Sequence, residues 1–127
     1  MLVLIAEDDE TTRMTLAKQV KQLGHRVLEA EDGAIAKHLY DQHHPDAVFT
    51  DWMMPEVDGV ELCRYIRTHP QSKGTYICMV TVKGGDWSRR EGLEAGASDY
   101  LVKPVRQEDL EQKLRAVIDQ RTVTRIR

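Results

Sequence analysis

The sequence has few of the features that mark secreted and membrane proteins. Its 127 residues include two cysteines, Cys63 and Cys78, which are too few for a disulfide framework or a four-ligand metal site, so we expect two reduced, packed thiols. No apolar run approaches the roughly 18 residues of a membrane span. Met1 leads directly into the apolar stretch 2–6, without the basic segment and cleavage site of a signal peptide. We therefore expect a cytoplasmic location and no membrane contact.

An excess of positive charge is also absent. The 18 Lys and Arg residues are outnumbered by 21 Asp and Glu residues, which gives a formal net charge of −3. Because binding to nucleic-acid phosphates depends mainly on clustered Lys and Arg, we expect no nucleic-acid contact by this segment. The composition, 41% hydrophobic and 31% charged, is ordinary for one globular domain. We assign residues 1–120 to that domain and the basic residues 121–127 to a tail or the start of a linker to an output module.

Short apolar runs alternate along the chain with segments of helical periodicity. The predicted strands are 2–6, 27–30, 47–50, 76–80 and 98–102. Apolar residues recur at helical spacing in 16–23, 35–40, 62–66 and 110–118, and a polar fourth helix is expected before Gly96. Gly24, Pro70 and Gly96 follow predicted helices, and Asp9 and Asp86 are candidate N-caps. Strict alternation with apolar strands predicts a doubly wound α/β fold, a five-stranded parallel sheet with helices on both faces.

Polar side chains follow four of the predicted strands. They are Glu7, Asp8, Asp51, Thr81 and Lys103. In parallel sheets, ligands bind beyond the carboxyl ends of the strands, so we expect these side chains to share one site. Two carboxylates about 4 Å apart repel by about 1 kcal/mol in water and by about 4 kcal/mol at an effective dielectric constant near 20. Because Mg²⁺ would offset this repulsion, the set predicts a site for a divalent cation and a phosphoryl group.

Four sequence segments occur together in a specific order. They are Leu4-Ile5-Ala6-Glu7-Asp8, Thr50-Asp51-Trp52-Met53-Met54-Pro55 with Asp58-Gly59, Val80-Thr81, and Gly96-Ala97-Ser98-Asp99-Tyr100-Leu101-Val102-Lys103-Pro104. Any one of these segments is a weak signal, but the full set at these intervals is specific. Over about residues 1–120 the sequence resembles the receiver domain of two-component response regulators. The resemblance implies the CheY-like, or flavodoxin-like, strand order 2-1-3-4-5.

The resemblance also implies the chemistry of the site. Asp51 would accept a phosphoryl group from a phosphohistidine on a sensor histidine kinase or a histidine phosphotransfer protein. Asp8, Asp51 and the backbone carbonyl of Met53 would bind Mg²⁺, with Mn²⁺ as an alternative ion, and Glu7 would hold the ion through water. The Lys103 ammonium would neutralise charge on the phosphoryl oxygens. Such a domain catalyses only its own phosphorylation and dephosphorylation and is not otherwise an enzyme.

A conformational switch is a further implication of the resemblance. The Thr81 hydroxyl would move toward the phosphoryl oxygens and the Tyr100 ring would turn inward, although a half-buried strand aromatic is an equally good interpretation of Tyr100. A cis Lys103–Pro104 bond would aim the ammonium into the pocket. We expect phosphorylation to remodel the face of the fourth helix, fifth strand and fifth helix. This face would contact an output partner or a fused effector domain, or would form a phosphorylation-dependent homodimer.

One position departs from the family pattern. Val82 stands directly after Thr81, where receivers usually have a small residue. Its branched side chain would crowd the entrance to the phosphoryl site, so we expect a comparatively long-lived phosphoform. Met53 and Lys83, two places after Asp51 and Thr81, would also affect the lifetime.

Two other classes of protein share parts of this pattern. A haloacid-dehalogenase-like phosphatase also has a nucleophilic aspartate after a parallel strand. It usually has a second acid two residues later, where this chain has Met53, and its nucleophile follows the first strand, whereas Asp51 follows the third. A pseudo-receiver would bind partners without phosphorylation, but the presence of all five polar residues argues against it. For Trp52, shielding of the site, contact with a partner and packing on the loop all stay open.

Overall fold

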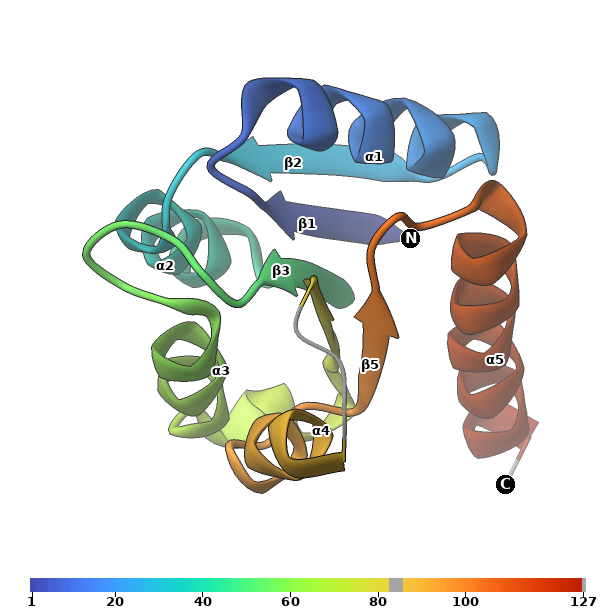
Figure 1. Cartoon of the computed structure of the whole chain (residues 1–127). Coiled ribbons are helices and arrows are strands. Elements are labelled where there is room, and N and C mark those ends of the chain that lie inside the picture. Colours follow the sequence, from blue (N-terminus) through green and yellow to red (C-terminus); the bar gives the residue numbers. More distant parts are fainter. Residues whose placement is uncertain (83–85, 127) are drawn as a thin grey trace.

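A parallel five-stranded sheet lies at the centre of the structure, a computed structural model (Figure 1). The structure describes the backbone of residues 1–82 and 86–126 and the side chains of residues 1–82 and 88–120. The strands in this part of the chain are β1 (Leu2–Ala6), β2 (Arg26–Ala30), β3 (Ala47–Asp51), β4 (Tyr76–Thr81) and β5 (Asp99–Val102). The helices are α1 (Glu10–Gln22), α2 (Gly33–His43), α3 (Gly59–Arg67), the 3₁₀ helix η1 (Pro70–Gly74), α4 (Asp86–Glu94) and α5 (Gln107–Ile126).

The strand order is β2-β1-β3-β4-β5, and each neighbouring pair is parallel. In the central register, Val3 lies opposite Val27 of β2 and Ala47 of β3. β1 therefore has neighbours on both sides, and β2 and β3 lie on opposite sides of it. The order of the strands and the doubly wound α/β class predicted from the sequence are both confirmed.

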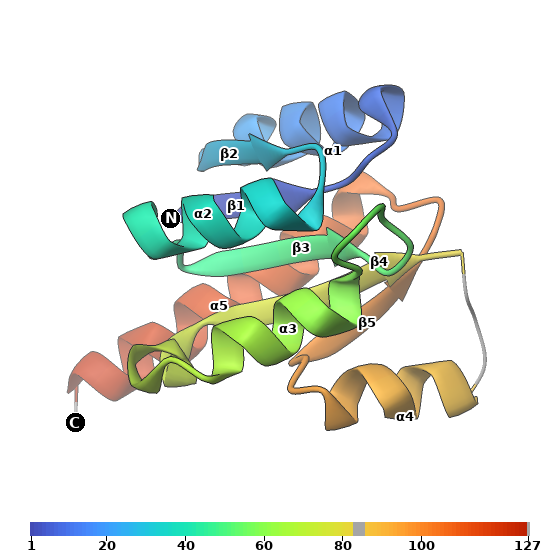
Figure 2. The same ribbon diagram turned by 90° about the vertical axis from the view of Figure 1, so that its left-hand side faces the viewer.

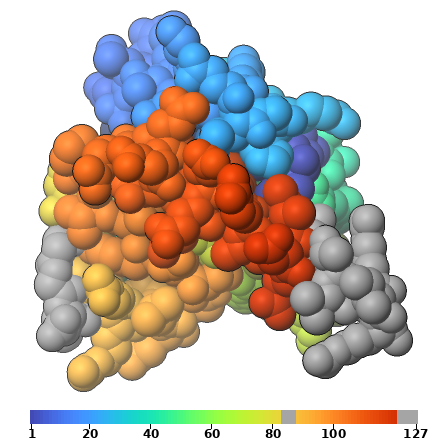
Figure 3. All heavy atoms as spheres, turned by 90° about the vertical axis from the view of Figure 1, so that its right-hand side faces the viewer, coloured from blue at the N-terminus to red at the C-terminus, as the bar shows by residue number. Residues whose placement is uncertain are grey.

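Hydrophobic side chains pack on both faces of this sheet. Because successive strand residues point to opposite faces, Leu4 and Val48 join one core with α2 and α3, while Val3 and Phe49 join the other with α1 and α5. Figure 2 shows α2, α3 and α4 in front of the sheet with α1 and α5 behind it. Figure 3 shows α1 and α5 side by side on the opposite face of the molecule, where they are in contact.

Both cysteines lie in these cores as free thiols, as expected. Cys63 of α3 and Cys78 of β4 are fully buried. Burial disfavours the thiolate and raises the pKa of Cys63 to about 11. In the part of the chain that the structure describes, no helix has both the length and the apolar character needed to cross a membrane.

Aspartate side chains cap three of the helices. Asp9, Asp32 and Asp58 each accept a hydrogen bond of 2.8 Å from the backbone N–H three residues later. These bonds satisfy amides that would have no partner inside the helix. The cap at Asp9 was predicted and the other two were not. At Asp86, α4 begins, but the capping side chain predicted there lies outside the described residues, as does Lys83.

The ends of the elements differ slightly from the predicted ranges. β3 and β4 each extend by one residue, to Asp51 and Thr81, and β5 begins at Asp99. The short helix η1 was not predicted, and its first residue, Pro70, was expected only to follow a helix. α5 continues to Ile126, so the backbone of residues 121–126 extends this helix. The division between a domain at 1–120 and a tail stays a prediction.

Candidate functional site

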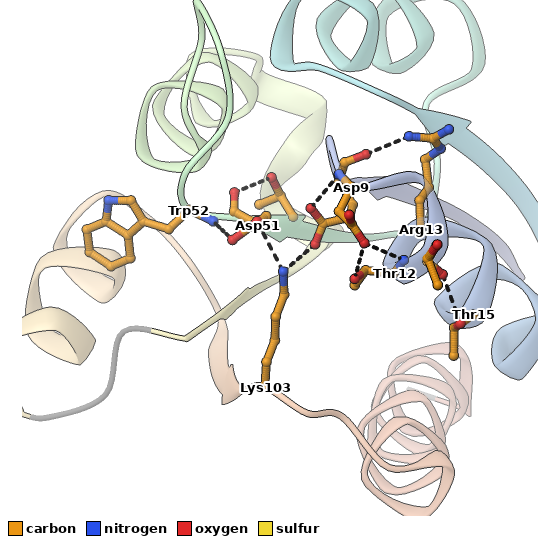
Figure 4. A network of polar contacts seen from close by, with 10 residues as sticks. Asp9, Thr12, Arg13, Thr15, Asp51, Trp52 and Lys103 are labelled. Atoms are coloured by element: carbon orange, nitrogen blue, oxygen red, sulfur yellow. Dashed lines mark hydrogen bonds and ion pairs between the residues drawn. The ribbon is translucent and has the colours of Figure 1, made fainter.

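The predicted polar residues lie at the carboxyl edge of the sheet, where Figure 4 shows the Lys103 side chain directed at Asp51. Glu7 and Asp8 follow β1, Asp51 is the last residue of β3, Thr81 is the last residue of β4, and Lys103 follows β5. Carboxylate oxygens of Glu7, Asp8 and Asp51 all lie within 4.8 Å of one another. Parallel pairing aligns the ends of β1 and β3, because Ala6 lies opposite Thr50. The register of the sheet therefore produces the acidic cluster.

The Glu7 carboxylate is the most buried acid of this cluster. Its Oε1 contacts the Lys103 ammonium, and its Oε2 accepts a hydrogen bond of 3.1 Å from the Asp9 N–H. Burial raises the pKa of Glu7 to about 7, the hydrogen bonds from Lys103 and Asp9 oppose that rise, and the negative charge of Asp51 adds to it. Burial thus disfavours the charged form of Glu7, and its contacts with Lys103 and Asp9 offset this effect only in part.

Lys103 bridges two of the acids, Glu7 and Asp51. Its ammonium contacts Glu7 and donates to Asp51 Oδ2 at 3.1 Å, and its backbone N–H donates to the Thr81 carbonyl at 2.9 Å. Burial alone would lower the pKa of Lys103, but the hydrogen bonds to Glu7 and Asp51 outweigh it and the pKa is raised. The peptide bond between Lys103 and Pro104 is cis. The raised pKa favours the charged ammonium, and the hydrogen bond of 3.1 Å directs it at Asp51.

Asp51 is held by contacts on both carboxylate oxygens. Its Oδ2 faces Lys103, and its Oδ1 accepts a hydrogen bond of 2.7 Å from the Trp52 N–H. The residue is 9% exposed and the neighbouring Asp8 is exposed, so the cluster is not closed off from solvent. Clustered carboxylate oxygens are the ligands that Mg²⁺ prefers. Glu7, Asp8 and Asp51 therefore fit a divalent cation.

The remaining predicted residues surround this cluster in different ways. The Thr81 side chain is fully buried at the end of β4, whereas Met53, in the loop after β3, is 58% exposed. Tyr100 of β5 is only 7% exposed, and its hydroxyl has no hydrogen-bond partner among the described residues. The ring of Tyr100 is therefore inward in this structure. Burial raises the pKa of its hydroxyl.

Trp52 connects the site to α4. Its backbone N–H contacts Asp51, while its indole is 3% exposed. Gly92 of α4 lies over the two aromatic rings, because a Cβ atom there would lie 3.7 Å from Trp52 Cζ3 and 3.9 Å from Tyr100 Cδ2. Of the three interpretations left open for Trp52, packing fits its burial. The role of Gly92 was not predicted, because only its low helix propensity is visible in the sequence.

Val82 directly follows Thr81 at the carboxyl end of β4. Its side chain is 73% exposed and, with Lys103, it lines a groove between α1 and the segment that precedes α5. Thr15 and Gln19 of α1 line the same groove. A branched side chain thus lines the same groove as Lys103, and whether it slows access to the phosphoryl site stays a prediction.

Comparison with known proteins identifies the family. Residues 3–115 match the response regulator receiver domain. Because this match covers most of the chain, the chain belongs to the family of response regulator receiver domains, which are signalling domains of two-component systems.

Individual relatives agree with this assignment. The transcriptional regulatory protein AfsQ1 of Streptomyces coelicolor is 38% identical over 116 residues, which are 91% of this chain and 50% of AfsQ1. Among solved structures, chemotaxis protein CheY4 of Vibrio cholerae is 30% identical with a TM-score of 0.86, over 91% of this chain and 97% of that one. The receiver domain of the Pseudomonas aeruginosa sensor histidine kinase PA1611 is 28% identical with a TM-score of 0.85, and the match covers 93% of this chain and 97% of that one. The PA1611 structure has a magnesium ion coordinated in its active site cleft.

The chain spans about half the length of the curated relatives it matches. The phosphate regulon regulator PhoB of Pseudomonas aeruginosa, for example, is 34% identical over 91% of this chain, but that match covers 51% of PhoB.

Gly59 lets the start of α3 approach Asp51 closely. A Cβ atom at residue 59 would lie 2.2 Å from the Asp51 carbonyl oxygen, which is an impossible contact. We expect Gly59→Ala to lower the free energy of unfolding by about 1–3 kcal/mol in chemical denaturation. The control is Gly74→Ala, since a Cβ atom there meets nothing within 4 Å. This control should change stability by less than about 0.5 kcal/mol. Equal effects in the two variants would contradict the role of the close approach.

Proposed function

We propose that this chain is a phosphoacceptor domain in which Asp51 receives a phosphoryl group in a reaction that depends on Mg²⁺. The observation that supports this proposal most directly is the contact of Lys103 with both Glu7 and Asp51 inside a cluster of three carboxylates. A structural ion pair needs one acid for one base. The additional acids have a clear use as ligands of a divalent cation beside a nucleophilic carboxylate.

The chemistry follows from the positions of these groups. Asp8, Asp51 and the Met53 carbonyl would hold Mg²⁺ directly, and Glu7 would hold it through water. The bound ion would neutralise charge on the phosphoryl oxygens. One Asp51 carboxylate oxygen attacks phosphorus in line, and the N–P bond of the donor phosphohistidine breaks as the new O–P bond forms. The Lys103 ammonium, already 3.1 Å from Asp51 Oδ2, stabilises charge on the transferred group.

The donor and the output are part of the same proposal. We propose a sensor histidine kinase or a histidine phosphotransfer protein as donor, and an output partner, a fused effector domain or a phosphorylation-dependent homodimer as the receiver of the signal. The names of the longer relatives support a fused effector, because AfsQ1 and PhoB are transcriptional regulatory proteins. A phosphatase function has less support, because Met53 stands where a second catalytic acid would be needed.

Phosphorylation should require both the ion and Asp51. We expect incubation with acetyl phosphate and Mg²⁺ to add the mass of one phosphoryl group to the intact protein, with the adduct stable in acid and labile in base. Chelation of Mg²⁺ and the variant Asp51→Asn should each abolish the adduct. Turnover of small phosphate esters would instead indicate a phosphatase. Partner binding that is unchanged in Asp51→Asn would indicate a pseudo-receiver.

Val82 should slow the exchange of phosphoryl groups at the site. Because its branched side chain lines the same groove as Lys103, we expect Val82→Ala to accelerate both phosphorylation by acetyl phosphate and loss of the phosphoryl group by severalfold. Val82→Thr is the matched control, since it keeps the branched shape at an exposed position, and its rates should stay close to those of the parent. If Val82→Ala changes neither rate, the side chain does not limit access.

The switch should alter the face of α4, β5 and α5. Thr81 would move toward the phosphoryl oxygens, and Tyr100 and Trp52, which both lie beneath Gly92, would couple the site to α4. We expect beryllofluoride with Mg²⁺ to change amide hydrogen exchange in residues 88–102 and in α5, and to leave β2 unaffected. Asp51→Asn should show no such change. Unaltered exchange in the parent protein would exclude this switch.

A further inference from the structure

The Arg13 guanidinium contacts the backbone of the acidic cluster, a contact that no pattern in the sequence predicted. Arg13 belongs to α1, but its Nη1 donates a hydrogen bond of 2.9 Å to the backbone carbonyl of Glu7. Its Nε also lies 3.6 Å from Glu29 Oε1 on β2. The side chain is 14% exposed, so a largely buried cation connects α1, the end of β1 and the neighbouring strand (Figure 4).

This guanidinium completes the hydrogen bonding of Glu7. The Glu7 N–H donates to the Ala30 carbonyl at 3.0 Å, and its carboxylate oxygens contact Lys103 and the Asp9 N–H. The Glu7 carbonyl is the remaining polar group, and Arg13 binds it. All four polar groups of Glu7 therefore have a partner, which fixes both its backbone and its side chain.

The hydrogen bond from Arg13 to the Glu7 carbonyl also restrains Asp8. A peptide group is planar, so fixing the Glu7 carbonyl also fixes the plane that leads to the Asp8 Cα atom. At the other end of the turn, the Arg13 backbone N–H donates to the Asp9 carbonyl at 2.9 Å. The side-chain bond of Arg13 holds one end of the turn 7–9, and this first backbone bond of α1, which does not depend on the arginine side chain, holds the other. Asp8, the exposed acid of the cluster, lies between them.

We propose that Arg13 is a positioning residue for the cation site: its guanidinium orients the Glu7–Asp8 peptide so that both carboxylates converge with Asp51 on one divalent ion. The inference rests on the proposed function, because that function supplies the ion. Arginine suits the role, because its planar fork presents separate nitrogens to the Glu7 carbonyl and to Glu29. The group touches neither the ion nor the phosphoryl group in this arrangement and acts through the backbone.

Magnesium affinity measured by calorimetry tests the proposal. We expect Arg13→Gln to weaken Mg²⁺ binding about tenfold, the lower end of the effect of groups that support metal ligands. Arg13→Lys, which keeps one charged donor, should restore part of the affinity. Glu29→Gln should bind Mg²⁺ within about twofold of the parent, since the bond from Nη1 to the Glu7 carbonyl remains. Should Arg13→Gln fail to fold, Arg13→Met, which keeps the apolar stem, replaces it in the comparison.

A second measurement separates positioning from general stability. Phosphorylation of the Arg13 variant by acetyl phosphate should be slow at limiting Mg²⁺ and should recover at saturating Mg²⁺, because a displaced ligand weakens binding of the ion. A variant that melts at lower temperature but binds Mg²⁺ like the parent would overturn the proposal, as would a phosphorylation defect that excess Mg²⁺ does not rescue. If the parent protein itself binds no Mg²⁺, the proposed function fails, and that result is distinct from equal binding by parent and variant.

Discussion

The site depends on the electrostatic interaction of three carboxylates with one ammonium at the edge of a parallel sheet. Neighbouring carboxylates repel one another, and burial of Glu7 increases the cost of its charge, so the raised pKa of Glu7 records an arrangement that is unfavourable without a cation. Lys103 offsets part of that cost through Glu7 and Asp51. On the proposed function, a divalent cation would offset the remaining repulsion and would allow the site to accept a phosphoryl group. The proposed reaction requires this combination, because Asp51 would take up a phosphoryl group and later release it.

The architecture was visible in the sequence because it depends on repeated, local signals. Alternation of apolar strands with helical segments predicted the doubly wound sheet, and once the strands are parallel, any polar residue at a strand end belongs to the same edge. Asp51 and Thr81 illustrate this, since they end neighbouring strands that pair directly, as the register of Asp51 with Val80 shows. The predicted site residues were therefore placed together by topology alone.

Side-chain contacts between helices were harder to predict, because sequence spacing does not determine them. Asp9 was recognisable as a cap from its position before a helix, but Asp58 was seen only as part of a motif. The burial of Trp52 depends on how closely α4 packs against the sheet, and the hydrophobic periodicity of the sequence does not specify that distance. The contact of Arg13 with Glu7 was missed for a similar reason: an arginine near the start of an amphipathic helix usually faces solvent, and only the packing of α1 against β2 turns this one inward.

The packing of Trp52 beneath α4 limits how this protein and its relatives can vary. A Cβ atom at position 92 would lie at ordinary contact distance from Met79, Trp52 and Tyr100, so a methyl group fits there and a larger side chain would need one of these three neighbours to move. A bulkier residue at position 92 should therefore be accompanied by a smaller one at position 52, 79 or 100. Among receiver sequences we expect a change at position 92 to occur together with a change at one of these neighbouring positions. Such a paired substitution would indicate that α4 packs against the sheet at a different distance.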